Sequence, residues 1–243
     1  MTEKRLQVLN RDAIKYIAML TMLLNHIAHI FLERGTPLYE IFQDIGFFTA
    51  PVMCFFLVEG YTYTRSKKEY GLRLLLFAVL SQIPFQLAFG YSTLNMIYTL
   101  FCCFLILVVA EKVRNPFLCR GLLLLLILAA MGGDWPVVAP FLTICLRAEW
   151  GDRRKMAVSY GMAYLLFAAL NAQSYVNGKC ALYVFTHALL SSLGILAAAV
   201  ATLVLYNGER AKHGKNFSKW FFYLFYPGHL LILYLIKSSL HNM

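Results

Sequence analysis

The stretch Arg11-Asp-Ala-Ile-Lys-Tyr-Ile-Ala-Met-Leu-Thr-Met-Leu-Leu-Asn-His-Ile-Ala-His-Ile-Phe31 predicts an apolar helix that begins with basic residues and carries two histidines near its far end. Lys15 and His26 are eleven positions apart. At about 100° per residue this separation is roughly three full turns, so the two side chains lie on one face, about 16 Å apart along the helix axis. Met19 and Met22 fall between them on the same stripe.

An ionisable side chain inside a membrane helix is costly, because lipid offers neither water nor a hydrogen-bond partner. His26 is therefore the first candidate for a functional residue, and His29 follows it close to the end of the same apolar run. The alternative interpretation of His26 is structural, with its ring hydrogen-bonded to a neighbouring helix.

The composition is that of a membrane protein. Of the 243 residues, 60% are hydrophobic and 14% are charged, and the mean hydropathy is +0.63. A soluble domain of this length does not hide so much apolar surface in one core. We therefore predict an all-α polytopic membrane protein. Residues 1–12 are too polar for the core of a signal peptide, so the first apolar segment is expected to be a retained membrane span.

The net charge of +10 is concentrated in short loops between apolar runs. This distribution is the positive-inside pattern of membrane proteins and does not indicate a nucleic-acid partner. The loops predicted to face the cytoplasm share clusters of Lys and Arg and comprise residues 65–73, 112–120, 147–155 and 209–219, with Lys4 and Arg5 before the first span on the same side. The basic-poor connections, which include residues 33–44, 90–95 and 132–136, are predicted to lie outside.

Nine membrane spans satisfy this loop pattern, with the N-terminus in the cytoplasm and the C-terminal Asn242 outside, in a bacterial cytoplasmic membrane. The predicted spans are approximately residues 13–32, 45–63, 72–89, 96–110, 118–131, 135–146, 156–171, 182–206 and 220–236. The fifth and sixth are shorter than the roughly 20 residues that cross a bilayer, so short, broken or re-entrant helices are expected there. No internal repeat or linker appears, which predicts a single domain over residues 1–243.

Common catalytic and metal-binding signatures are absent from the sequence. The six cysteines show no paired metal-ligand spacing and are interpreted as small core residues. Gly-x-Ser-x-Gly, His-Glu-x-x-His and Gly-rich phosphate loops do not occur. We therefore expect no metal cofactor.

Two further groups of residues are candidates for chemistry. Glu59 lies in the inner half of the second span, above the basic residues Arg65, Lys67 and Arg73, and His229 follows a Tyr-Pro-Gly sequence in the last span. Basic side chains at the inner surface would attract a cytosolic donor with a phosphate-rich head. A histidine, whose pKa is close to neutral, is suited to take a proton from an attacking amine or hydroxyl.

Each of these groups also has a structural interpretation. The basic loop can serve orientation alone. Glu59 can form an ion pair with Arg65 or Arg73, and His229 can lie at a turn distorted by Pro227.

The sequence resembles the TraX family over nearly its whole length. The segments that carry the resemblance are residues 15–27, 51–56, 59–65, 70–78, 81–85 and 222–234. The founding member of the family N-acetylates the N-terminal amine of a pilus subunit. The family is also similar to a larger group of transmembrane acyltransferases, in which a basic residue, ten further residues and a histidine mark the first helix. Lys15 and His26 have this spacing, with Lys where the larger group usually has Arg.

The resemblance implies that His26 is the catalytic histidine, that Lys15 helps to hold the donor, and that the donor is acetyl-CoA. Family members often have Asp before this histidine, whereas this chain has Asn25, which cannot supply a negative charge to an imidazolium. The negative charge that stabilises the imidazolium would then have to come from Glu59, Asp44 or Asp134. The alternative is that no such charge is needed.

The expected function is a membrane-embedded acetyltransferase that moves an acetyl group from cytosolic acetyl-CoA to an amine or hydroxyl acceptor on a peptide, glycan or small molecule. Its expected catalytic residues are His26, Glu59 and His229, and its expected donor-binding residues are Lys15, Arg65, Lys67 and Arg73. The alternatives are a small-solute transporter and a non-catalytic membrane assembly partner. A transporter would show two halves with matching broken helices, and the sequence shows no such symmetry. The sequence leaves the oligomeric state open, homo-oligomers included.

Overall fold

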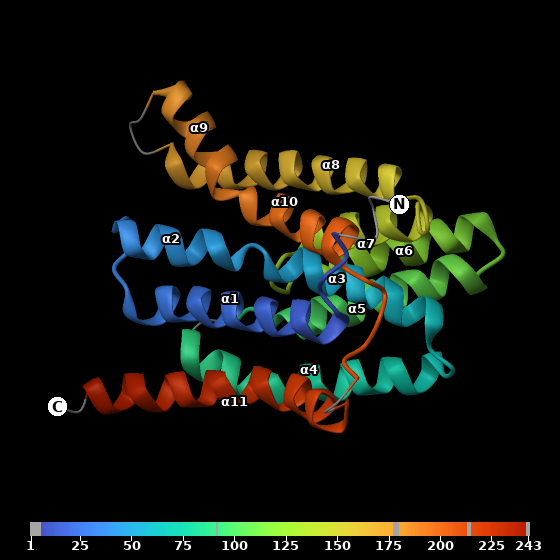
Figure 1. Ribbon diagram of the computed structural model, residues 1–243, viewed down its shortest axis with the longest axis horizontal. Helices are drawn as coiled ribbons and strands as arrows, with labels where there is room; N and C mark the ends of the chain where they lie inside the picture. Colours follow the sequence, from blue (N-terminus) through green and yellow to red (C-terminus); the bar gives the residue numbers. More distant parts are fainter. Residues whose placement is uncertain (1–5, 91, 177–179, 213–214, 242–243) are drawn as a thin grey trace. The chain divides into compact units, whose positions relative to one another are not determined.

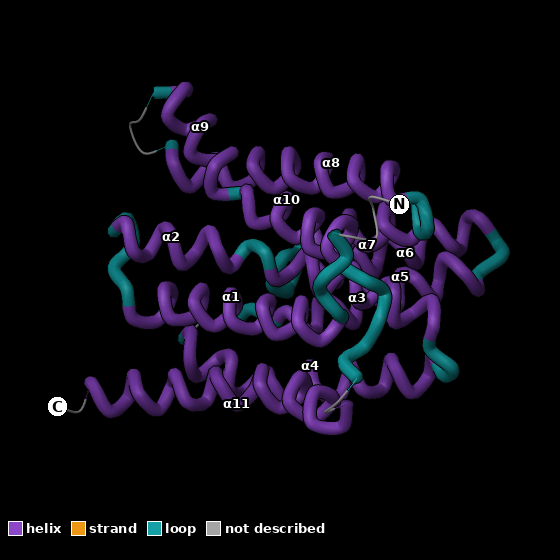
Figure 2. Tube along the Cα trace, in the orientation of Figure 1, coloured by secondary structure: helices purple, strands orange, loops and turns teal. Residues whose placement is uncertain are grey.

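The computed structural model describes residues 6–90, 92–176, 180–212 and 215–241 (Figure 1). Helices dominate these residues, and none of them forms a named β-strand (Figure 2). Five segments are long and apolar enough to cross a membrane, namely Arg11–Phe31, Pro37–Tyr63, Lys67–Phe89, Ala181–Leu205 and Trp220–Leu240. The prediction of an all-α membrane protein is thus confirmed. The number of membrane crossings and their orientation remain predictions. The predicted locations of Lys4, Arg5 and Asn242 fall outside the described residues.

The chain forms two compact units. The first comprises Met1–Val52 and Glu149–Ser218, and the second comprises Met53–Ala148 and Lys219–Met243. The chain therefore leaves the first unit within helix α3 (Thr49–Tyr63) and returns to it after helix α7 (Val138–Ala148). The single domain predicted over residues 1–243 remains a prediction.

The first unit begins with two antiparallel helices, α1 (Arg11–Phe31) and α2 (Pro37–Gly46), which lie side by side (Figure 1). The Asn10 side chain caps α1 by accepting from the Ala13 amide at 2.9 Å. Thr36 caps α2, and Pro37 occupies its first turn. The connection predicted over residues 33–44 therefore contains the start of a helix, because this cap and proline begin α2 before the apolar run. The side of the membrane on which it lies stays a prediction.

The second predicted span is a broken helix, since α2 turns at Phe47 before α3 begins at Thr49. The Thr49 hydroxyl donates to the Ala18 carbonyl of α1 at 2.8 Å, which fixes the start of α3. Helix α10 (Leu193–Ala199) passes directly over the turn. A Cβ added at Gly194 would lie 2.7 Å from the Phe48 nitrogen, so only glycine permits this approach.

The rest of the first unit consists of α8 (Arg153–Asn171), the short helix η2 (Ala172–Tyr175), α9 (Ala181–Ser191), α10 and the π-helix η3 (Val200–Leu205). The eighth predicted span, residues 182–206, is interrupted near Ser192, whose hydroxyl donates to the Ala188 carbonyl at 2.6 Å. Such back-bonding by Ser bends helices. The Tyr160 and Thr202 hydroxyls, 3.0 Å apart, connect α8 to η3.

The segment before α1 pairs with the segment that follows η3 (Figure 2). The Leu9 amide donates to Leu205 and the Leu9 carbonyl accepts from Asn207, both at 2.9 Å. The Ala211 amide donates to the Asp12 carboxylate at 2.7 Å. Both segments were predicted to lie on the cytoplasmic side, and the structure places them together.

The second unit contains part of α3, together with α4 (Lys67–Phe89), α5 (Met96–Lys112), α6 (Pro116–Ala130), α7 and most of α11 (Lys215–His241). Helix α5 packs against α4, α6 and α7. Helices α6 and α7 have 15 and 11 residues, which confirms that the fifth and sixth apolar segments are short. Near its C-terminal end, α11 contacts α4 through Lys237, whose ammonium donates to the Ala88 carbonyl at 3.2 Å.

Two connections of the second unit that were predicted to be external are joined by hydrogen bonds. The Leu94 amide donates to Gly132 and the Asp134 amide donates to Leu94, both at 2.9 Å. A Cβ on Gly133 would lie 2.3 Å from the Thr99 hydroxyl, so a larger residue here would displace the Thr99 side chain. Burial raises the pKa of Asp134 to about 6, against a smaller opposing effect of the Trp135 amide that donates to it.

Candidate functional site

The predicted Lys15–His26 face of α1 is the inward face of this helix. Met19, Met22 and His26 are buried, and Lys15 is partly exposed at the N-terminal end of the stripe. Ile17, on the opposite face, is 41% exposed, as expected for a residue that faces lipid. The structure therefore places an ionisable ring on the packed side of an apolar helix.

Asn25, which stands where an aspartate was expected from the family, makes a structural contact. Its side-chain nitrogen donates to the Gln43 carbonyl in the last turn of α2 at 3.1 Å. A Cβ added at Gly46 would lie 2.3 Å from the Asn25 Cβ, so the two helices approach closely at this pair. A carboxylate at position 25 would have no proton to donate, and the amide therefore has a physical reason to be there.

Two polar groups of the first unit lie along the same helix pair. The His29 ring nitrogen Nδ1 is 3.1 Å from the hydroxyl of the buried Tyr39, which gives this second histidine a structural role. Asp44, one of the acids considered for the histidine, belongs to the same unit as His26. Its Oδ1 atom is buried and has no hydrogen-bond partner among the described residues. A buried carboxyl oxygen in this condition is costly, so Asp44 is a candidate for function.

In the second unit, Glu59, Gly60 and Tyr61 have three different environments. Glu59 is buried, with 9% of its surface exposed. A Cβ on Gly60 would lie 2.8 Å from the Tyr70 hydroxyl, which explains the glycine. The fully buried Tyr61 donates its hydroxyl to Glu111 at 2.7 Å. This segment of the family resemblance is thus explained in part by packing.

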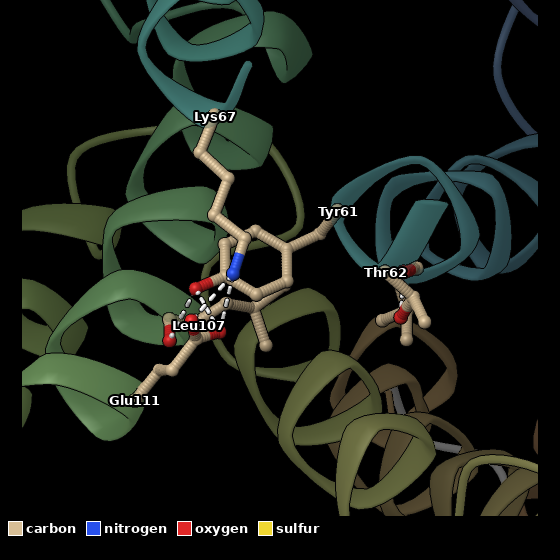
Figure 3. A network of polar contacts seen from close by, with 6 residues as sticks. Tyr61, Thr62, Lys67, Leu107 and Glu111 are labelled. Atoms are coloured by element: carbon tan, nitrogen blue, oxygen red, sulfur yellow. Dashed lines mark hydrogen bonds and ion pairs between the residues drawn. The ribbon is translucent and has the colours of Figure 1, made fainter. Parts of the chain in front are cut away.

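Lys67 is held by Glu111 of α5 (Figure 3). Its ammonium lies 2.5 and 2.6 Å from the two carboxylate oxygens and 4.3 Å from the centroid of the Tyr61 ring. The guanidinium carbon of Arg147 in α7 lies 5.8 Å from the same centroid. The sequence pointed to Lys67 and to the segment that contains Tyr61, but Glu111 and Arg147 were missed, because they are so far from Lys67 in the chain that no local signal indicates their contact.

The other predicted donor-binding residues of this unit lie nearby along the chain. Arg65 is exposed in the turn between α3 and α4. Arg73 is 3.9 Å from Glu69, one helical turn earlier in α4. Both keep a positive charge close to the start of α4, as the loop pattern predicts.

His229 is buried in α11, which continues through Pro227 as one helix. Its Nδ1 atom lies 2.7 Å from the Phe225 carbonyl oxygen. Because a carbonyl only accepts hydrogen bonds, Nδ1 carries the proton, and in the neutral ring Nε2 carries the lone pair. In this tautomer Nε2 is the accepting nitrogen of the His229 ring.

The described residues contain no group of three or more His, Cys, Asp and Glu side chains with the geometry of a metal site. Lys15 and His26 belong to the first unit, whereas Glu59, Arg65, Lys67, Arg73 and His229 belong to the second. Within the first unit the structure confirms the shared face of Lys15 and His26, and within the second it reveals the Lys67 cluster.

The fold and these residues define a helical membrane protein with ionisable side chains on the packed faces of apolar helices. The family described as TraX protein matches residues 10–237, and the chain belongs to this family. The probable fimbrial assembly protein FimC, serogroup H1, of Dichelobacter nodosus is 30% identical over 242 residues, which cover 93% of this chain and 95% of that protein. No solved structure matches the chain. The family resemblance seen in the sequence is confirmed.

Proposed function

We propose that the protein is a multi-pass acetyltransferase of the cell membrane that moves an acetyl group from cytosolic acetyl-CoA to an amine or hydroxyl acceptor, with His26 as its catalytic histidine. The observation that carries this proposal is the family match over residues 10–237, which includes every residue proposed for the site. The burial of His26 on the same face as Lys15 supports it.

The chemistry follows from the properties of the reacting groups. A protonated amine has no lone pair, so it cannot attack the thioester carbonyl until a base has removed a proton. Neutral imidazole has a suitable pKa, whereas Asp and Glu are normally too weak as bases and Lys is normally protonated. The acceptor then forms a bond to the acetyl carbon, the carbon–sulfur bond breaks, and the imidazolium gives its proton to the leaving CoA thiolate. An amine acceptor also loses a second proton from its nitrogen to water, which leaves the neutral amide.

The finer assignments belong to the same proposal. Lys15, Arg65, Lys67 and Arg73 are proposed to attract the phosphate groups of the donor, and Glu59 and His229 to assist transfer. The protonated Nδ1 of His229 supports this part, because it leaves Nε2 as an acceptor of a proton or hydrogen bond. The structural alternatives for Glu59 and His229 predict instead that their loss lowers stability together with activity.

Nine crossings, with the N-terminus inside and the C-terminus outside, are part of the proposal as well. Three contacts support it, each between segments assigned to the same side of the membrane: Leu9 with Leu205, Lys67 with Glu111, and Leu94 with Asp134. Cysteine labelling from outside in sealed cells tests the orientation. Labelling at Ser66, which caps α4, would contradict it.

A second candidate function is a non-catalytic role in assembling a surface fibre. The naming of the Dichelobacter nodosus relative as a probable fimbrial assembly protein favours it. One experiment separates the two. The purified protein in nanodiscs is incubated with radiolabelled acetyl-CoA and host membranes, and the labelled product is identified. Transfer that depends on the protein supports the enzyme, and its absence with all host fractions supports the assembly role. Solute flux without acetyl-CoA would indicate a transporter.

A further inference from the structure

Four helices of the second unit contribute to one polar cluster at the end predicted to face the cytoplasm. Tyr61 comes from α3, Lys67 from α4, Glu111 from α5 and Arg147 from α7. Figure 3 shows the ammonium of Lys67 beside both the Tyr61 ring and the Glu111 carboxylate. The charge of Arg147 also acts on this carboxylate. Residues from such different parts of the sequence are brought together only by the fold.

The cluster has an excess of hydrogen-bond donors and positive charge. Lys67 and the Tyr61 hydroxyl both bind the single carboxylate of Glu111, and a second cation, Arg147, lies near the Tyr61 ring. An ammonium carries three donors and a guanidinium carries five in a planar fork, and this combination suits the several oxygens of a phosphate group. The side chains of Lys67 and Glu111 are 31% and 39% exposed, so a solute can reach them.

Glu111 is poorly explained as a purely structural residue. It is the penultimate residue of α5, where the partial negative charge of the helix C-terminus opposes a carboxylate. Its ion pair with Lys67 is partly exposed, and such pairs contribute little to stability because water screens them. The carboxylate is therefore held mainly by the same donors that would bind another anion.

We propose that Lys67, Arg147 and the Tyr61 hydroxyl form a binding site for a phosphate group, and that the Glu111 carboxylate competes with this phosphate for the same donors. The inference rests on the proposed function only for the identity of the ligand, since acetyl-CoA carries a 3′-phosphate and a pyrophosphate. An anionic lipid headgroup at the inner membrane surface offers the same chemistry. Glu111 is a positioning residue that sets the affinity of the site.

The test compares two glutamates in the full-length protein, reconstituted in nanodiscs of neutral phosphatidylcholine. Glu111→Gln removes the competing charge and keeps the shape of the side chain. Glu149→Gln is the matched control, because Glu149 also pairs with a lysine, Lys155, at 3.6 Å, and its loss changes the net charge equally. The probe is CoA, whose affinity is measured by calorimetry.

We expect Glu111→Gln to bind CoA at least ~5-fold more tightly, because a charged competitor for the donors is gone, and Glu149→Gln to stay within ~2-fold of the unmodified protein. The gain should disappear when Lys67→Gln is added. In a parallel arm, nanodiscs containing phosphatidylglycerol are analysed by native mass spectrometry for retained lipid. If CoA affinity is unchanged but Glu111→Gln retains more of this lipid, and Lys67→Gln abolishes the gain, the phosphate belongs to the lipid.

The proposal is overturned if Glu111→Gln increases neither CoA affinity nor lipid retention. Should this variant not fold, Arg147→Gln decides the matter, since it should weaken either CoA binding or the retention of phosphatidylglycerol, and the site is overturned if it changes neither. Acetyl transfer is measured separately. Tighter binding without any transfer would end the proposed enzyme and keep the phosphate site. Transfer combined with no effect of Glu111→Gln or Arg147→Gln on either CoA binding or lipid retention would end the site alone.

Discussion

The two units place their candidate lysines in different surroundings. In the first, Lys15 begins a stripe of α1 that runs through buried methionines to the buried His26. In the second, Lys67 and Glu111 form a partly exposed ion pair at 2.5 Å, and we call this pair the exposed rim of the unit. Ionisable groups on a packed face have large energetic consequences, whereas exposed ion pairs are screened by water. Substitutions in the buried stripe should therefore have much larger effects than substitutions at the rim.

The largest effect is expected for His26→Ala. If His26 removes the proton of the acceptor, its loss should lower acetyl transfer by at least ~10²-fold while CoA binding persists. Transfer is measured with radiolabelled acetyl-CoA, and binding by calorimetry. The control is His187→Ala, because His187 is an exposed histidine of α9. Near-normal turnover in His26→Ala would end its catalytic assignment.

Lys15→Ala should have the next largest effect. Loss of a charge-assisted contact to a phosphate should weaken acetyl-CoA binding by about 1.5–3 kcal/mol. The exposed Lys155 provides the control, since Lys155→Ala removes an equal charge from the first unit without touching the stripe. Equal affinities for both variants would show that Lys15 acts only through the total charge.

Gly46→Ala tests the close contact between α1 and α2. The added Cβ would lie 2.3 Å from the Asn25 Cβ, so the helices must separate, at a cost of about 1–3 kcal/mol. Thermal unfolding in detergent measures the change. Gly161→Ala in α8 is the control, because a Cβ there meets no atom of the described residues within 4 Å. Two equally stable variants would mean that the α1–α2 contact is looser than the structure shows.

Lys67→Gln should change stability least. Because its pair with Glu111 is partly exposed, the free energy of unfolding should fall by no more than about 1 kcal/mol. The same thermal unfolding measurement applies, with Gly46→Ala as the reference for a large effect. A loss as large as that of Gly46→Ala would remove the distinction between the buried stripe and the exposed rim.

Local patterns in the sequence predicted most of the helices. Apolar runs between basic loops located α1, α4, α5 and α8, and the spacing of Lys15 and His26 predicted the buried stripe. The break between α2 and α3 was missed, because it depends on Gly46 and Gly194 approaching other helices closely. These approaches are tertiary contacts that leave no periodic signal.

The candidate site divides in the same way. Residues that share one helix could be paired from their spacing alone, as Lys15 and His26 were. Glu111 and Arg147 could not be predicted as neighbours of Lys67, because only the packing of helices α4, α5 and α7 brings their ends together. The reason for Asn25 was likewise hidden, because its partner is the backbone carbonyl of Gln43.

The hydrogen bonds between the first residues of α1 and the segment after η3 also constrain biosynthesis. Asp12 and its partner Ala211 are 199 positions apart, and residues 53–148 of the second unit lie between them in the chain. Because Asp12 is synthesised long before Ala211, the hydrogen bond between them can form only after nearly the whole chain has been inserted. The first unit is therefore the first to be synthesised but among the last to complete its folding. The insertion machinery must accordingly hold a partly folded set of helices for most of translation.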